Sequence, residues 1–184
     1  MKDKHLDIRI RQCLVLAEAS GCPRRKFGAV LVDPARNVVL ADGYNGGPRG
    51  QDGSLCRGTW CERDGVKSGT MMELGCHHAE SNVIANAAAN GVPTHGSWLI
   101  VTGEPCPMCA KLMHHAGVVC VVVVRGGYAG GSAGVEYLER VGVDVVYRDG
   151  PSDPRSDHPY ELTWDGRKPI GHDGSDLPST DAPP

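Results

Sequence analysis

Two short motifs constrain the fold of this chain more than any other feature of its sequence. The first, His78-Ala79-Glu80, opens one predicted helix, and the second, Cys106-Pro107-Met108-Cys109, opens another. A predicted strand over residues 97–102 separates the two helices. Cys106 and Cys109 are three positions apart, so their sulfurs share one face of a helical turn. The two helix starts can therefore meet and offer an imidazole and two thiolates to one ion.

This set of donors is typical of zinc, which prefers tetrahedral nitrogen and sulfur ligands. Three protein ligands, His78, Cys106 and Cys109, leave the fourth position open for water, whose pKa the ion lowers towards about 7. Glu80 is not needed as a ligand, and we predict that it carries protons between this water, a substrate ring nitrogen and a departing ammonia. The alternative is a closed zinc knuckle, or two buried thiols beside a capping glutamate. The motif favours one catalytic zinc per chain and the replacement of an amine by a carbonyl.

Hydrophobic periodicity predicts alternating helices and strands along most of the chain. Glycine and proline mark the ends of several of these segments. Elements of these lengths predict an α/β fold, a three-layer sandwich around a mostly buried sheet. We expect helices over 5–19, 78–90, 106–116 and 132–141, a hairpin over 27–32 and 38–41, and further strands over 97–102, 118–124 and 143–147.

The eight cysteines are expected to bind metal or to pack in the core, not to form disulfides. The N-terminus lacks the apolar core of a secretory signal, which favours a cytoplasmic location, where thiols stay reduced. Residues 44–76 show no periodicity, and so long an irregular stretch needs something to hold it. A second, structural zinc would do so, with four candidate ligands: Cys22, Cys56, Cys61 and Cys76. They could equally be independent small hydrophobic residues, and His77 could replace one ligand.

The charge and composition argue against large polyanionic or membrane partners. The net charge is −3, aromatic residues make up 5% of the chain, and no long basic run is present, so we expect no nucleic-acid partner. The longest apolar run, 118–124, is far shorter than a membrane span, so we expect no membrane partner. A small substrate with a single anionic group remains compatible with this surface.

Beyond the zinc motif, the chain resembles the cytidine deaminase-like superfamily and, within it, the deoxycytidylate (dCMP) deaminases. The resemblance covers about residues 5–147. The Gly-Tyr-Asn-Gly stretch is its most discriminating part. The matching segments, in order, are Gly28-Ala29-Val30, Gly43-Tyr44-Asn45-Gly46-Gly47-Pro48-Arg49-Gly50, Ala79-Glu80-Ser81-Asn82, Pro105-Cys106-Pro107-Met108-Cys109-Ala110-Lys111-Leu112-Met113 and Ala116-Gly117.

The resemblance implies a mixed five-stranded sheet with helices on both faces and zinc-dependent hydrolysis of dCMP to dUMP and ammonia. It implies that Asn45 contacts the sugar, that the Ala79 amide contacts the pyrimidine carbonyl and that Tyr128 contacts the nucleotide. Relatives are often homo-oligomers, hexameric or dimeric, and many respond to dCTP and dTTP. Some carry a second zinc with a ligand where Cys76 stands. A deaminase domain over 1–147 and a polar C-terminal extension over 148–184 follow from its extent.

Several alternatives remain open at this level. Asn45 could be only a turn former, Tyr128 could be a packing residue, and Arg24 with Arg25 could hold a 5′-phosphate or be solvated charges. The segment 73–77 and Val83 depart from the commonest pattern, which leaves the substrate open. Cytidine, guanine, a riboflavin precursor or a tRNA base are alternative substrates. A catalytically silent nucleotide-binding zinc protein is a third interpretation, although an intact Glu80 argues against it.

Overall fold

The chain folds around a mixed five-stranded sheet in the order β2-β1-β5-β6-β7. The computed structural model describes residues 1–48, 56–57, 60–61, 63, 65–66, 75–124 and 132–150. Strand β1 is antiparallel to both β2 and β5, whereas β6 is parallel to β5 and β7. The elements are α1 (Asp3–Glu18), β1 (Gly28–Asp33), β2 (Val38–Tyr44), β3 (Cys56–Arg57), β4 (Trp60–Cys61), α2 (Ala79–Ala89), β5 (Trp98–Val101), α3 (Pro107–His115), β6 (Cys120–Val124), α4 (Ser132–Arg140) and β7 (Asp144–Arg148).

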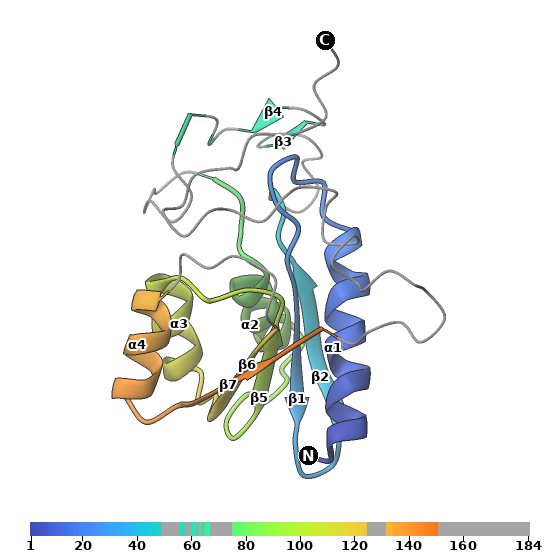
Figure 1. Ribbon diagram of the computed structural model, residues 1–184, viewed down its shortest axis with the longest axis vertical. Helices are drawn as coiled ribbons and strands as arrows, with labels where there is room; N and C mark the ends of the chain where they lie inside the picture. Colours follow the sequence, from blue (N-terminus) through green and yellow to red (C-terminus); the bar gives the residue numbers. More distant parts are fainter. Residues whose placement is uncertain are drawn as a thin grey trace.

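The sheet lies between two helical layers, which confirms the predicted three-layer α/β sandwich. Helix α1 covers one face, and α2, α3 and α4 cover the other (Figure 1). Successive side chains of each strand belong to two separate cores, one on each face of the sheet. On the α2–α4 side lie Leu31, Leu99 and Val121, and on the α1 side lie Val30, Ile100 and Val122. Because successive side chains of each strand point to opposite faces of the sheet, each face offers an apolar surface on which a helical layer packs.

The predicted elements are all present, with boundaries shifted by a few residues. The third helix begins at Pro107 and not at Cys106, because Cys106 is the N-cap and Pro107 takes the first helical position, which needs no N–H donor. Within residues 44–76, which carried no pattern, the described residues include the two-stranded hairpin β3–β4. Of the predicted extension over 148–184, only residues 148–150 are described.

No helix in the described part of the chain is long and apolar enough to cross a membrane.

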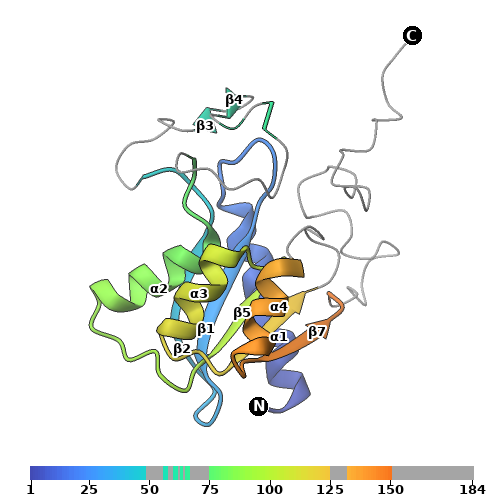
Figure 2. The same ribbon diagram turned by 90° about the vertical axis from the view of Figure 1, so that its left-hand side faces the viewer.

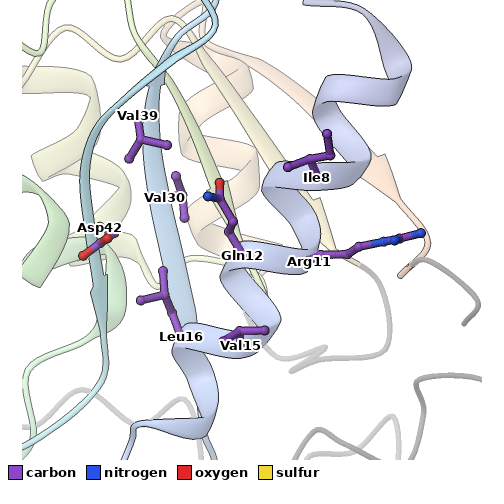
Figure 3. A pocket seen from close by; sticks show the side chains of 8 residues that line it. All are labelled: Ile8, Arg11, Gln12, Val15, Leu16, Val30, Val39 and Asp42. Carbon is purple, nitrogen blue, oxygen red and sulfur yellow. The ribbon is translucent and has the colours of Figure 1, made fainter.

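A cavity of about 400 Å³ lies between α1 and strands β1 and β2 (Figure 3). Its walls are mostly aliphatic, with three polar residues among them. None of the predicted ligands or catalytic residues contributes to it, so this cavity is separate from the zinc motif. The lining residues are Ile8, Arg11, Gln12, Val15, Leu16, Val30, Val39 and Asp42.

Helix α1 lies close against the sheet at Gly28, the first residue of β1. A Cβ atom there would overlap the Cys13 carbonyl oxygen and lie 2.9 Å from the Ala17 amide nitrogen. Both clashes are with helix backbone, which cannot move aside without displacing the whole helix. Gly28 is therefore required for α1 to pack on β1.

We expect Gly28→Ala to lower the free energy of unfolding by about 1–3 kcal/mol or more, because it overpacks the contact between α1 and β1. Chemical denaturation of the full chain measures this. Gly21→Ala is the matched control: no atom lies within 4 Å of its added Cβ, and we expect a change within about 0.5 kcal/mol. Equal stabilities of the two variants would contradict this account of the packing.

Candidate metal centre

Two helix N-caps carry the predicted zinc ligands. His78 is the N-cap of α2 and Cys106 is the N-cap of α3, both in extended backbone conformation. Cys109 lies in the first turn of α3, and its amide donates a hydrogen bond of 3.5 Å to the Cys106 sulfur. The two helices begin at a common point, at the end of the layer nearest the β3–β4 hairpin (Figure 2). The N-terminal partial positive charge of each helix therefore acts on the same small volume.

The three donor atoms have the spacing of a tetrahedral zinc site. The Nδ1 atom of His78 lies 3.5 Å from the Cys106 sulfur and 3.6 Å from the Cys109 sulfur. Ordinary Zn–N and Zn–S bond lengths with tetrahedral angles require a nitrogen–sulfur separation of about 3.5 Å. All three donor atoms lie within 4.8 Å of one another. These separations are compatible with one zinc ion bound by all three atoms.

The two thiols share a proton unequally. The hydrogen bond from the Cys109 thiol is the largest influence lowering the pKa of Cys106, and the same bond raises the pKa of Cys109. The hydrogen bond with Cys106 also raises the pKa of His78. The three side chains therefore interact closely, and a cation that replaces their protons would bind both sulfurs as thiolates.

Glu80 lies in the first turn of α2, two residues after the candidate ligand His78. Its side chain is only 5% exposed, and burial is the main cause that raises its pKa, against the smaller opposing effect of His78. A buried carboxyl group with a raised pKa takes up and releases a proton nearer neutral pH than a solvated one does. This behaviour suits the role predicted from the sequence.

Asn45 is tied to the metal segment through its neighbour Gly46. Gly46 and His77 exchange two backbone hydrogen bonds, of 3.1 and 2.8 Å, as an isolated antiparallel bridge. The Asn45 side chain is buried: its Oδ1 accepts from the Phe27 amide at 2.7 Å, and its Nδ2 donates to the Arg25 carbonyl at 2.9 Å. Asn45 therefore joins the start of β1 to the residues beside His78.

The other predicted substrate contacts fall in different settings. Ala79 is fully buried as the first residue of α2. The guanidinium of Arg24 donates to the carbonyl groups of Arg63 and Val66, both at 2.9 Å, and so anchors that loop. Tyr128 lies outside the described residues.

The four cysteines predicted to bind a second zinc lie in two parts of the sequence, Cys22 in one and the other three over residues 56–76. Arg24 links these two parts. Cys22 and Cys61 are buried, Cys76 is half-buried, and Cys56 pairs with Cys61 across the β3–β4 hairpin. The Cys22 sulfur accepts a 3.4 Å hydrogen bond from the Arg25 amide. Among the side chains that the structure describes, only His78, Cys106 and Cys109 form a cluster of three metal donors. The side chain of Cys56 is not among the described ones. No disulfide joins the described cysteines.

Two asparagines of α2 were not singled out from the sequence as structural residues. The amides of Asn82 and Asn86 donate to the carbonyl groups of Tyr44 and Asp42, at 2.7 and 2.8 Å. These carbonyl groups lie on the outer edge of β2, so α2 covers part of an edge strand that would otherwise be open. Two asparagines four residues apart on one helix, next to a predicted edge strand, are the sequence signal that could have indicated these helix-to-strand hydrogen bonds.

The fold and the donor set define an α/β zinc-binding domain with a His-x-Glu and Cys-x-x-Cys site. Residues 4–125 match the sequence family described as the cytidine and deoxycytidylate deaminase zinc-binding region. The chain belongs to this family.

Curated relatives and solved structures agree with this membership. The chain is 34% identical to ComE operon protein 2 of Bacillus subtilis over 73% of its own length, and 31% identical to a probable deoxycytidylate deaminase of Drosophila melanogaster over 71%. It spans just under two thirds, 66%, of each of these relatives. It also resembles the dCMP deaminase of cyanophage S-TIM5 solved with dCMP and dUMP, with a TM-score of 0.67 and 28% identity, over 80% of this chain and 99% of that one.

The buried carboxyl group generates a prediction about stability and pH. Because burial raises the pKa of Glu80 in the folded state, the metal-free folded protein holds this proton more tightly than the unfolded chain does. Its contribution to stability is present below the unfolded pKa and is lost as the pH rises through the folded pKa. Gln has no such proton, so we expect Glu80→Gln to gain stability relative to the parent as the pH rises through this window.

Urea denaturation of both metal-free proteins at a series of pH values measures the difference. The same series on Glu136→Gln, an exposed residue of α4, is the control and should run parallel to the parent. A difference between Glu80→Gln and the parent that is independent of pH would contradict the assignment of a raised pKa.

Proposed function

We propose that this protein hydrolyses the exocyclic amine of a cytosine nucleotide, converting dCMP to dUMP and ammonia. The observation that carries the proposal is the convergence of His78 Nδ1 with the sulfurs of Cys106 and Cys109, beside the buried carboxyl of Glu80. Membership of the deaminase family supports the reaction type, and the likeness to a dCMP deaminase solved with dCMP and dUMP supports the substrate.

His78, Cys106 and Cys109 would hold the zinc, which supplies Lewis-acid activation of a water molecule when bound. The protein's own contribution is to hold His78 and Cys106 as helix N-caps and Cys109 in the first turn of α3. Cys106 is held by its hydrogen bond from the Cys109 amide, and the His78 carbonyl accepts a 2.8 Å bond from the Ser81 hydroxyl. Such partners hold ligands in the orientation that the metal needs.

Glu80 is the group that moves protons in this scheme. Its carboxylate takes one proton from the attacking water and delivers it to N3 of the cytosine ring, and a further proton passes through it to the leaving amine. The bond from C4 to the amine nitrogen breaks as the new C4–oxygen bond becomes a carbonyl. Burial serves this exchange because it brings the pKa of Glu80 nearer to the working pH.

Two of the proposed substrate contacts come from residues near the candidate metal ligands. We assign the Ala79 amide to the pyrimidine carbonyl and Asn45 to the sugar, and the bridge between Gly46 and His77 supports this by bringing the Asn45 segment beside the metal segment. Tyr128 is assigned to the nucleotide. The Arg24 side chain is bonded to loop carbonyls, so its role in holding a phosphate would be through the loop that it anchors.

We also propose a second, structural zinc bound by Cys22, Cys56, Cys61 and Cys76. The hairpin pairing of Cys56 with Cys61 supports it, as does the amide bond to the Cys22 sulfur. Arg24 further supports it by joining the segment after Cys22 to the segment after Cys61. A zinc at this place would hold together a stretch whose sequence shows no hydrophobic periodicity.

Glu80→Gln is expected to lower kcat for dCMP by about 100-fold or more, because it removes the proton carrier but keeps the shape of the side chain. Ammonia release from dCMP, CMP, deoxycytidine, cytidine, dCTP and guanine measures the activity and the choice of substrate. Zinc content, measured on the same samples, should be equal in the variant and the parent.

Two outcomes would contradict parts of the proposal. If folded, zinc-loaded protein releases ammonia from none of these compounds, the assignment as a deaminase fails. If nucleosides react as fast as their monophosphates, the reaction type stands and the choice of dCMP is wrong.

Metal stoichiometry tests the two zinc sites separately. We expect about two zinc ions in the parent protein, and about one in either His78→Ala or Cys61→Ala, because each variant removes one ligand of a different site. Elemental analysis of purified protein gives the number. Cys120→Ala, which removes a buried core thiol of β6, is the control and should retain both ions. About one zinc in the parent, unchanged in Cys61→Ala, would reject the second site.

A further inference from the structure

The short loop between β5 and α3 sets the position of Cys106, and so of one candidate zinc ligand. Its first residue, Thr102, is fully buried and bonds both the amide and the carbonyl of Gly28, at 2.9 and 3.3 Å. Pro105 is also buried. The beginning of the loop is thus attached to β1. Other contacts must hold its end at Cys106.

Helix α4 supports this loop from one side through Gly134. A Cβ atom at this position would overlap the Pro105 carbonyl oxygen and lie 2.9 Å from the carbonyl carbon of Cys106. Gly134 is buried, and the clash would be with backbone. Helix α4 therefore rests directly on the peptide that joins Pro105 to the ligand Cys106.

Strand β7 supports the same loop through Tyr147. The Tyr147 hydroxyl donates a 2.9 Å hydrogen bond to Oε1 of Glu104, two residues before Cys106. The Tyr147 ring packs against the core on the α2–α4 side, which fixes the direction of its hydroxyl. Glu104 and Tyr147 are 43 residues apart in the sequence, so the bond joins two distant elements.

We infer that Tyr147 and Gly134 are positioning residues for the zinc site, which together hold the Glu104–Pro105–Cys106 loop so that the Cys106 sulfur meets the His78 imidazole. Both residues lie beyond residues 4–125, the part that matches the deaminase family. Metal ligands must be held to within about 0.5 Å, and groups outside the ligand set do this holding. The inference rests on the proposed function for the identity of the metal.

The two residues act by holding the position of the loop, and their substitution changes no charge at the zinc site. Loss of the Tyr147 hydroxyl removes one bond that holds the Glu104 side chain and lets the loop sample positions in which the Cys106 sulfur is farther from His78. A methyl group at position 134 pushes the Pro105 carbonyl away from α4 and shifts Cys106 directly. Both changes weaken zinc binding while the helices and the sheet remain folded.

The experiment measures zinc affinity by competition with a chromophoric chelator, using the full-length protein. We expect the apparent zinc dissociation constant to rise about 10-fold in Tyr147→Phe and at least as much in Gly134→Ala. Glu104→Gln keeps an acceptor oxygen and should retain the parent affinity, whereas Glu104→Ala should resemble Tyr147→Phe. The visible spectrum of the cobalt(II) form should change in the weakened variants, since it reports the geometry around the sulfur ligands.

Matched controls separate positioning from general stability. Tyr137→Phe removes a hydroxyl that contacts the exposed His114 at 3.4 Å, and Gly150→Ala adds a methyl in ordinary contact with Val124. Both should bind zinc like the parent. Parent-like zinc affinity in Tyr147→Phe would overturn the inference, even if the metal-free variant melts at a lower temperature.

The affinity assay is independent of turnover, so the two proposals can fail separately. If Tyr147→Phe binds zinc more weakly and the parent deaminates no cytosine nucleotide, the positioning role stands and the proposed function fails. If the parent is an active deaminase and Tyr147→Phe keeps both its zinc affinity and its cobalt spectrum, the positioning role fails and the function stands.

Discussion

The meeting of two helix N-termini at one nitrogen and two sulfur atoms is the constraint on which the rest of the structure depends. Strands β5 and β6 are parallel, and β2 is antiparallel to β1, which is itself antiparallel to β5. The carboxyl ends of β2, β5 and β6 therefore reach the same edge of the sheet. Ligands of open α/β sheets bind beyond this edge. The segments that follow β2 and β5 begin at Asn45 and Thr102, so the order of the strands brings the Asn45 segment and the loop before Cys106 to the same end of the sheet.

Close packing of helices on the sheet holds this arrangement. Gly28 lets α1 lie against β1, and Gly43 lets α2 approach β2, since a Cβ at Gly43 would lie 3.1 Å from the Val83 amide. The asparagine bonds from α2 to the carbonyl groups of Tyr44 and Asp42 add polar contacts along the same line. With α2 fixed along its length, its first residue and the His78 cap cannot drift from the sheet edge. The ligand on α2 is placed by packing, and the ligands on α3 are placed by the loop before it.

Local patterns were enough to predict the elements and the cluster of three candidate metal ligands, because both depend on short spacings. The pattern over 78–90 predicted α2 at Ala79–Ala89, and the Cys-x-x-Cys spacing predicted two sulfurs on one turn. The bond between Tyr147 and Glu104 has no such local signature: it joins a strand to a loop, and neither residue type is unusual in its place. The role of Asn45 was similarly underdetermined, since a turn former and a buried amide bonded to Phe27 and Arg25 look the same in sequence. Pairs far apart in sequence become visible only when the sheet is assembled.

The site also carries a cost in stability that the fold has to offset. A buried Glu80 with a raised pKa and two thiols within reach of one imidazole are less favourable than apolar residues in the same volume. Zinc would bind the folded arrangement and not the separated ligands of the unfolded chain, so ligation would stabilise the fold by the free energy of binding. The same groups that lower the stability of the metal-free domain would thus stabilise the metal-bound domain. Any change that loosens Cys106 should then lower zinc affinity and the stability of the zinc-bound protein together.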